Sequence, residues 1–267
     1  MLHGFFKRVA PVVAMAMGAA VASCNGAEIN FGAGDGVPLA ELDTGGEAPT
    51  GVVLASPDTL IVSEGPALDI AVTGDPEAVE AMRFTIDDGT LGVMREKDLR
   101  NVGGRATVRV TMPSLSSIVL AGSGTVEAAS LSGDADVTIA GSGTVRTAQV
   151  QATNFSMTVA GSGAYEASGS ADALDLSIVG SGRSDMAELT VGSADVTIAG
   201  SGAAQFASDG KVEASIVGSG EVTVIGRATC SISAVGSGKL HCREASSTTA
   251  ARGEQSAGTG DWSEGEN

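Results

Sequence analysis

The sequence predicts an all-β fold: a parallel β-helix, or solenoid, with coils of about 19 residues that we expect to be right-handed. Two observations predict it. The tripeptide Gly-Ser-Gly occurs seven times, at intervals of 18 to 20 residues, and a fixed interval near twenty is typical of solenoids. Between the triplets, apolar and polar residues alternate, as in strands that bury one face. An aromatic content of 3% suits a narrow core of aliphatic side chains.

The alternation keeps its phase within each repeat. Val137 and Ile139 precede the triplet at Gly141 and Val145 follows it, while Thr138 stands between the first two. Residues an even number of positions from the first glycine of a triplet should therefore point inward, and residues an odd number of positions away should point outward. We call these inward and outward offsets. The structural turns are Gly122-Ser123-Gly124, Gly141-Ser142-Gly143, Gly161-Ser162-Gly163, Gly180-Ser181-Gly182, Gly200-Ser201-Gly202, Gly218-Ser219-Gly220 and Gly236-Ser237-Gly238.

Both glycines of a triplet fall on inward offsets. Glycine has no Cβ, so the chain can bend there or pass close to the opposite wall. A phosphate-binding loop is the alternative for such a glycine-rich motif, but that loop occurs once and precedes a helix. Seven copies between strands favour a structural turn.

The first residues resemble a bacterial signal peptide of the lipoprotein type, residues 1–23. Lys7 and Arg8 precede an apolar stretch that is too short to span a membrane as a helix. Val21-Ala22-Ser23-Cys24 resembles a lipobox, in which cleavage leaves a lipidated cysteine, here Cys24, at the new N-terminus. We expect a lipid-anchored protein of the bacterial cell envelope, in the outer membrane or a periplasm-facing membrane. The alternative is an ordinary secretory signal and a secreted or periplasmic protein.

Three further segments follow the signal peptide. Residues 24–56 carry the lipid-attachment cysteine and read as a flexible linker rich in Gly, Ala, Pro and acids. Residues 57–243 form the expected β-helical domain. Residues 244–267 are predicted to be a disordered acidic tail.

The segment before the first triplet carries its own strand signals. Asp88-Gly89 lies between alternating apolar runs and predicts a hairpin turn. Pro113 suits a position where no ladder N–H is needed. We expect residues 57–112 to form the first coils or a β cap that protects the solenoid edge.

Residues 57–242 as a whole resemble a bacterial family, DUF2807, described as a putative auto-transporter adhesin "head GIN" domain. The resemblance rests on the order of elements: four strand-like segments and then the Gly-Ser-Gly repeats. Those segments are residues 60–62, 68–75, 84–91 and 108–115. The resemblance implies a parallel β-helical body, and the family has no catalytic motif to carry over. The tripeptide Gly-Ile-Asn of the family's name is absent here.

Two cysteines flank the last triplet. Cys230 stands six residues before Gly236 and Cys242 six after it, so both should point inward in one coil. In an oxidising envelope they are disulfide candidates, and the alternative is two buried thiols. A zinc site is disfavoured, because His241 has outward parity and no four-ligand set exists. We expect no metal site.

Acidic side chains recur on one outward position, five residues before the first glycine: Asp136, Asp175, Asp195 and Glu213. Asp175, Asp195 and Glu213 occupy consecutive coils, so they would form a ladder with side chains about 5 Å apart. Such a ladder could bind Ca²⁺ or a cationic partner. A solvated acidic face that limits aggregation is the favoured interpretation.

Charge and residue types then narrow the function. A net charge of −17 argues against nucleic acid as a partner. No Ser/His/Asp or Cys/His set can be assembled, so we expect no catalytic residues, no cofactor and no enzyme. The expected role is structural or adhesin-like. We expect the N-terminal lipid to bind the membrane and the folded domain to contact envelope or extracellular polymers. The alternative is a β-helix that binds polysaccharide or, less favoured, cleaves it. Exposure of Tyr165 or Arg183 in a groove would favour the carbohydrate-binding alternative.

Overall fold

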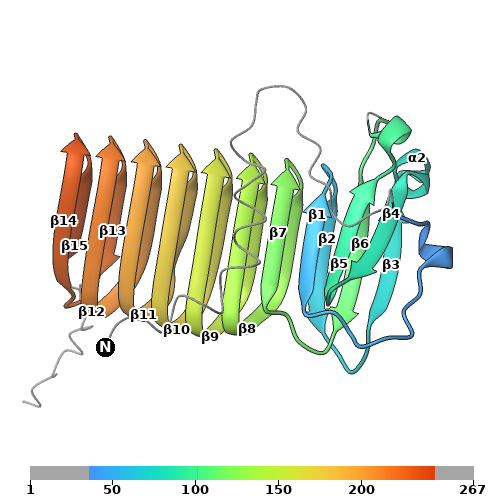
Figure 1. Cartoon of the computed structure of the whole chain (residues 1–267), viewed down its shortest axis with the longest axis horizontal. Helices are drawn as coiled ribbons and strands as arrows, with labels where there is room; N and C mark the ends of the chain where they lie inside the picture. The colour runs from blue at the N-terminus through green and yellow to red at the C-terminus, as the bar shows by residue number, and fades with distance from the viewer. Residues whose placement is uncertain (1–35, 101, 244–267) are drawn as a thin grey trace, which may run out of the picture.

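The computed structural model describes residues 36–100 and 102–243 and shows a rod of stacked β-coils (Figure 1). A group of shorter strands with one short helix lies at the N-terminal end of the rod. The predicted signal peptide 1–23, the lipid site Cys24 and the tail 244–267 lie outside the described residues.

The elements follow in chain order, almost all of them strands. They are η2 Leu39–Glu41, β1 Gly51–Ala55, β2 Thr59–Glu64, β3 Asp69–Gly74, α2 Pro76–Glu80, β4 Met82–Asp87, β5 Thr90–Arg95, η3 Lys97–Leu99, β6 Ala106–Met112, β7 Ser117–Gly122, β8 Thr125–Gly141, β9 Thr144–Gly161, β10 Ala164–Gly180, β11 Arg183–Gly200, β12 Ala203–Gly218, β13 Glu221–Ile225, β14 Thr229–Gly236 and β15 Lys239–Arg243.

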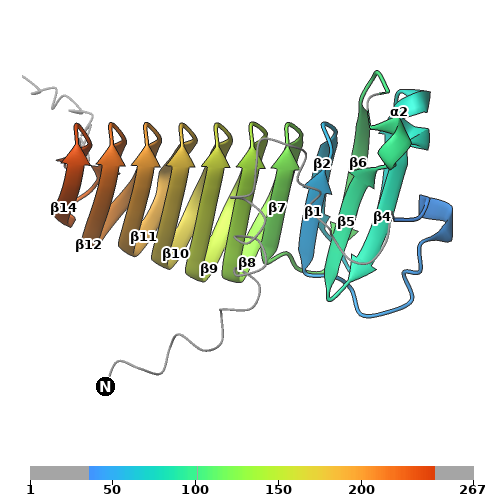
Figure 2. The same cartoon turned by 45° about the horizontal axis from the view of Figure 1, so that its top comes forward.

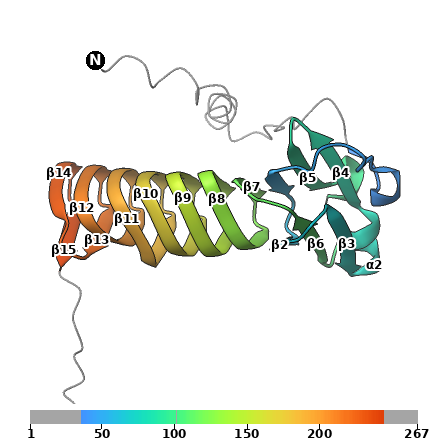
Figure 3. The same cartoon turned by 90° about the horizontal axis from the view of Figure 1, so that it is seen from below.

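The repeats form a parallel β-solenoid, as predicted. Each strand from β8 to β12 runs round most of a coil and pairs in parallel with the strand of the next coil. Seen from below, the ribbon winds continuously along the rod (Figure 3). The triplets stack in register, since Gly180 pairs with Gly161 on one side and with Gly200 on the other.

The core is a set of aliphatic stacks, one side chain per coil. One stack contains Ile118, Val137, Met157, Leu176, Val196 and Ala214, all buried and paired in register. Burying a Val, Leu or Ile side chain stabilises the folded state by about 1.5–3 kcal/mol. In this stack each side chain is buried by the coils on either side of its own. Phe155, Tyr165 and Phe206 are buried in the same core.

The two glycines of a triplet have different roles, and this corrects the expectation that both point inward. The second glycine faces the core: a Cβ on Gly182 would lie 2.4 Å from Cγ1 of Val159. The first glycine is partly exposed and lies on the backbone ladder. Gly180 has φ +119°, and a Cβ there would lie 2.5 Å from the carbonyl oxygen of Gly161 in the preceding coil. Left-handed φ and close coil stacking therefore both require glycine.

The predicted linker boundary at residue 56 is wrong, because the fold begins well before residue 57. β1 pairs in parallel with β5 and β7, and Val52, Val53 and Leu54 within it are buried. Further upstream, Val37 forms a bridge with Phe84. A short apolar run that is buried on both faces lacks the alternation that identifies the later strands. The Gly and Pro residues around it made the segment resemble a linker.

Antiparallel strands close the N-terminal end of the rod. β4 and β5 form a hairpin whose turn residues Asp88 and Gly89 have φ values of +45° and +72°, which confirms the predicted turn. β3 pairs antiparallel with β6, and α2 follows β3 in the chain. Figure 2 shows β4 and α2 at this end, beyond β5 and β6. Residues 57–112 thus provide the cap and, through β2, part of the first coil, whose other strand is β1.

Candidate interaction surfaces

The outward faces of the coils hold open hollows rather than an enclosed site. One hollow of about 680 Å³ runs across β8 to β11. Another of about 360 Å³ lies over β11, β12 and β14. Both are lined by strand residues, so no long loop deepens either of them. Such shallow surfaces suit contact with an extended partner better than enclosure of a small molecule.

Charged side chains alternate along the first hollow, which we call the Arg146 groove after its central residue. Arg146 on β9 lies between Glu127 and Glu166 of the adjacent coils, with Nη1–Oε1 at 3.9 Å and Nε–Oε2 at 2.8 Å. The hydrogen bond that Arg146 donates to the Glu166 carboxylate raises the pKa of the Arg146 guanidinium. Asp185 follows in register after Glu166. The acids outnumber Arg146, so the groove remains acidic.

The predicted acidic ladder forms in register on the opposite side of the coils. Asp175 pairs with Asp195, and Asp195 pairs with Glu213. Burial raises the pKa of Asp175, and the charge of Asp195 raises it further. In the described part of the chain, no group of three His, Cys, Asp or Glu residues converges closely enough to hold a metal ion.

Asp136, at the other end of the ladder, is half-buried and has no acidic neighbour on the ladder. It pairs in register with Ser117 on one side and Ser156 on the other. Burial raises the pKa of its carboxyl, although hydrogen bonds from Ser156 and Thr138 oppose the change. The ladder is therefore interrupted by serines and concentrates its charge on Asp175, Asp195 and Glu213.

An apolar ladder that sequence analysis did not single out runs beside the triplets. The outward residue just before each first glycine is Ala or Val in every coil. Val179, Val217 and Val235 are 56%, 58% and 70% exposed. Attention to the odd offsets, which are otherwise polar, could have identified this ladder.

Tyr165 and Arg183, whose exposure in a groove would have favoured carbohydrate binding, do not line a common groove. Tyr165 is fully buried, and its hydroxyl lies 3.2 Å from Oγ1 of Thr147, with which it forms a hydrogen bond. Burial raises the pKa of Tyr165 well above its usual value. Arg183 is exposed, but Tyr165 offers no ring surface on which a sugar could stack.

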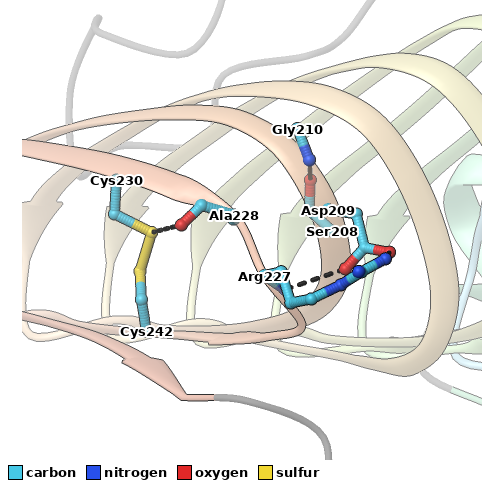
Figure 4. The surroundings of a disulfide bond; sticks show 7 residues. All are labelled: Ser208, Asp209, Gly210, Arg227, Ala228, Cys230 and Cys242. Carbon is cyan, nitrogen blue, oxygen red and sulfur yellow. Dashed lines mark hydrogen bonds and ion pairs between the residues drawn. A yellow bond between two sulfur atoms is a disulfide. The ribbon is translucent and has the colours of Figure 1, made fainter.

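The cysteines of the last coil form a disulfide, shown in Figure 4. Their Cα atoms are 6.7 Å apart, within the range that a disulfide spans. Cys230 is half-buried, whereas Cys242 is exposed. His241 lies beside Cys242 on the outer face, with Nε2 3.6 Å from Oε1 of Glu221.

Among residues 36–100 and 102–243, no helix has the length and apolar character needed to cross a membrane.

Comparison with known families matches residues 48–228 to the family DUF2807, described as "Putative auto-transporter adhesin, head GIN domain". The match begins at residue 48, just before β1, which is the first buried strand. A search of curated proteins found no match.

Solved bacterial structures share the fold. A putative adhesin from Bacteroides fragilis superposes with a TM-score of 0.66 at 19% identity, covering 74% of this chain and 93% of its own. A putative lipid binding protein from Parabacteroides distasonis has a TM-score of 0.57 at 22% identity, covering 73% and 93%. A putative adhesin from Parabacteroides merdae has a TM-score of 0.55 at 19% identity, covering 74% and 92%. At these identities the likeness establishes the fold alone.

Proposed function

Because the chain belongs to the DUF2807 family, we propose that it is a non-catalytic protein of the cell envelope with a structural or adhesin-like role. The observation that carries the proposal is an unbroken rod whose outward faces repeat the same kinds of side chain from coil to coil. A partner bound to one coil meets similar groups on the next, about 4.8 Å away. Many weak contacts of this kind can give strong attachment.

The proposed partner is an extended polymer of the envelope or of the extracellular surface. Open, strand-lined hollows such as the Arg146 groove give it continuous contact, whereas small-molecule chemistry would need an enclosed pocket. The acidic ladder and the net charge of −17 favour cationic groups on that polymer and disfavour nucleic acid.

Attachment to the membrane completes the proposal. Cleavage at the lipobox would leave Cys24 lipidated, and several acyl chains, each contributing about 0.8 kcal/mol per buried CH₂, anchor firmly. The folded rod begins near Val37, so the spacer between lipid and rod is shorter than the linker 24–56 predicted from sequence.

Deletion of the coding sequence tests the role. We expect the deletion strain to lose surface attachment or envelope integrity, and the full-length protein to restore it in trans. A Cys24→Ser variant should move from the membrane fraction to the soluble fraction, and its continued partition with membranes would contradict the lipid anchor. If both phenotypes are unchanged and the purified protein cleaves a polysaccharide, the proposed role is wrong.

A further inference from the structure

The outer edge of β3 is unpaired in the cap. Among residues 36–100 and 102–243, β6 is the one strand that pairs with β3 (Figure 3). The other column of strands ends on β4, where a bridge from Val37 to Phe84 covers part of the edge. β3 contains no Pro and no Lys, the residues that commonly protect an edge strand. Its free edge is therefore a template for pairing with another strand.

Hydrogen bonding to β6 fixes which residues of β3 face the free edge. The N–H of Asp75, just after β3, donates to the carbonyl of Arg105 at 3.1 Å. In an antiparallel pair, residues that exchange hydrogen bonds alternate with residues whose backbone groups point away. The odd-numbered residues of β3 therefore bond to β6. The backbone N–H and C=O groups of Ile70 and Val72 point to the free edge.

The side chains of Ile70 and Val72 also lack a neighbour on this edge. Both are half-buried and pack against the core, while the residues between them are exposed. In the described part of the chain, no strand lies beyond them to complete their burial. A strand with apolar residues at alternate positions would do so. β3 itself has this pattern.

We propose that β3 pairs antiparallel with β3 of a second copy of this chain, about a two-fold axis at Ala71. In this register Ile70 lies opposite the partner's Val72, and Val72 lies opposite the partner's Ile70. Each of these pairs exchanges both of its backbone hydrogen bonds across the interface. The same surface serves both copies, so the assembly closes as a dimer.

Charge complementarity favours this register. Arg109 on β6 is exposed and lies opposite Ala71, and its Nη1 is 3.3 Å from Oγ1 of Thr73. The two-fold axis at Ala71 places the partner's Asp69 opposite Thr73, where its carboxylate meets the Arg109 guanidinium. A register shifted by two residues would instead place Asp69 opposite the partner's Asp75, and two like charges would face each other.

The dimer leaves the surfaces of the rod free. The contact lies in the cap, whereas the Arg146 groove and the acidic ladder lie on the coils from β8 onward. A dimer therefore presents two sets of repeating coil faces on one particle. Two linked binding surfaces hold a polymer more tightly than one without any new kind of contact.

Sedimentation of the full chain tests the proposal. Cys24→Ser serves as the background, so that no lipid drives association, and we expect a concentration-dependent dimer. Val72→Pro removes an N–H that faces the free edge and leaves the hydrogen bonds to β6 in place. We expect this variant to remain folded and to become monomeric. Val72→Ile is the matched control, because it keeps the N–H and the apolar side chain, and it should remain dimeric.

Charge reversal gives a second test that leaves the backbone of β3 unchanged. Asp69→Arg and Arg109→Asp should each raise the dissociation constant about tenfold or more, because like charges then meet across the interface. The double variant restores opposite charges and should recover the dimer. Asp172→Arg, which reverses an exposed charge on β10, should have no effect.

Three results would overturn the proposal. The first is that the Cys24→Ser chain sediments as a monomer at every concentration. The second is that its dimer survives Val72→Pro. The third is that Asp69→Arg and Arg109→Asp leave the dissociation constant unchanged, since another face of the molecule would then hold the dimer together.

Discussion

Arg95 and Asp58 form an ion pair that is buried at the junction between the cap and the solenoid, with side-chain exposures of 2% and 0%. Nε of Arg95 lies 2.8 Å from Oδ2 of Asp58, and Nη2 lies 2.6 Å from Oδ1. Arg95 also donates to the carbonyls of Val102 and Gly104, and the backbone N–H of Ala106 donates to Asp58. The pair therefore ties the end of β5, the turn after β1 and the start of β6 into one unit.

Removal of one member of this pair should destabilise the protein strongly. Arg95→Met leaves the Asp58 carboxylate buried without its partner, so we expect the free energy of unfolding to fall by about 3–5 kcal/mol. Arg146→Met is the matched control, because it removes an exposed arginine between two acids and should cost about 1 kcal/mol or less. Denaturant titration of both variants measures the difference, and equal losses would contradict the role assigned to the buried pair.

The same pair should make the protein sensitive to acid. Burial would raise the pKa of Asp58, but hydrogen bonds from Arg95, Ala106 and Ser56 outweigh it and hold the pKa below the ordinary value of 3.8. The unfolded state thus binds the proton more readily. The stabilisation is complete above pH 3.8 and is lost as pH falls toward the folded-state pKa. We expect Asp58→Asn to flatten the dependence of unfolding free energy on pH in that range; an unchanged slope would refute this.

Steric contact between coils can be tested at Gly182. A Cβ there would meet Cγ1 of Val159, so Gly182→Ala should cost about 1–3 kcal/mol as an overpacked core position. Val159→Ala makes room, and the double variant should therefore be more stable than the sum of the single losses predicts. Gly180→Ala should gain no such relief from Val159→Ala, because its Cβ meets the backbone of Gly161. Thermal unfolding of the three single variants and the two double variants measures the coupling.

Periodicity predicts those parts of the fold in which one position repeats. Strand phase, inward stacks such as Val137 over Met157, and the Asp88-Gly89 hairpin all follow from residue order, because a period of two fixes which face is buried. β1 was missed because a strand buried on both faces lacks that period. The Asp58–Arg95 pair was also missed, because its members are 37 residues apart and neither belongs to a repeat.

Periodicity likewise predicts some surface features of the rod and not others. The acidic ladder follows from spacing alone, because consecutive coils place equivalent residues side by side. The Arg146 groove depends on a cross-coil ion pair that only the register of three strands reveals. Ile232 on β14 is 46% exposed although its parity is inward, because no coil follows it among the described residues. Parity alone does not reveal that exposure.

Repulsion within the acidic ladder should lower stability at neutral pH. Burial and the charge of Asp195 raise the pKa of Asp175 above 3.8, so the folded state holds the proton more tightly and stability falls as pH rises through the folded-state pKa. Asp175→Asn should stabilise the protein at pH 7 by about 0.5 kcal/mol and give no gain below pH 3.8. Asp172→Asn removes an exposed charge from the same strand off the ladder and should have a smaller effect. A stabilisation that persists in acid would contradict the repulsion.

Reduction of the Cys230–Cys242 disulfide should loosen the last coil and leave the rest of the rod intact. The bond closes a loop with a sequence separation of 12, for which loss of the constraint on the unfolded chain costs about 3 kcal/mol. Because each coil contacts only its neighbours, the loss should stay local. Hydrogen exchange should therefore accelerate in β14 and β15 after reduction, or in a Cys230→Ser, Cys242→Ser variant, while amides of β9 and β10 keep their protection. Equal acceleration throughout the rod would show that the coils unfold as a single unit and that the disulfide acts on all of them.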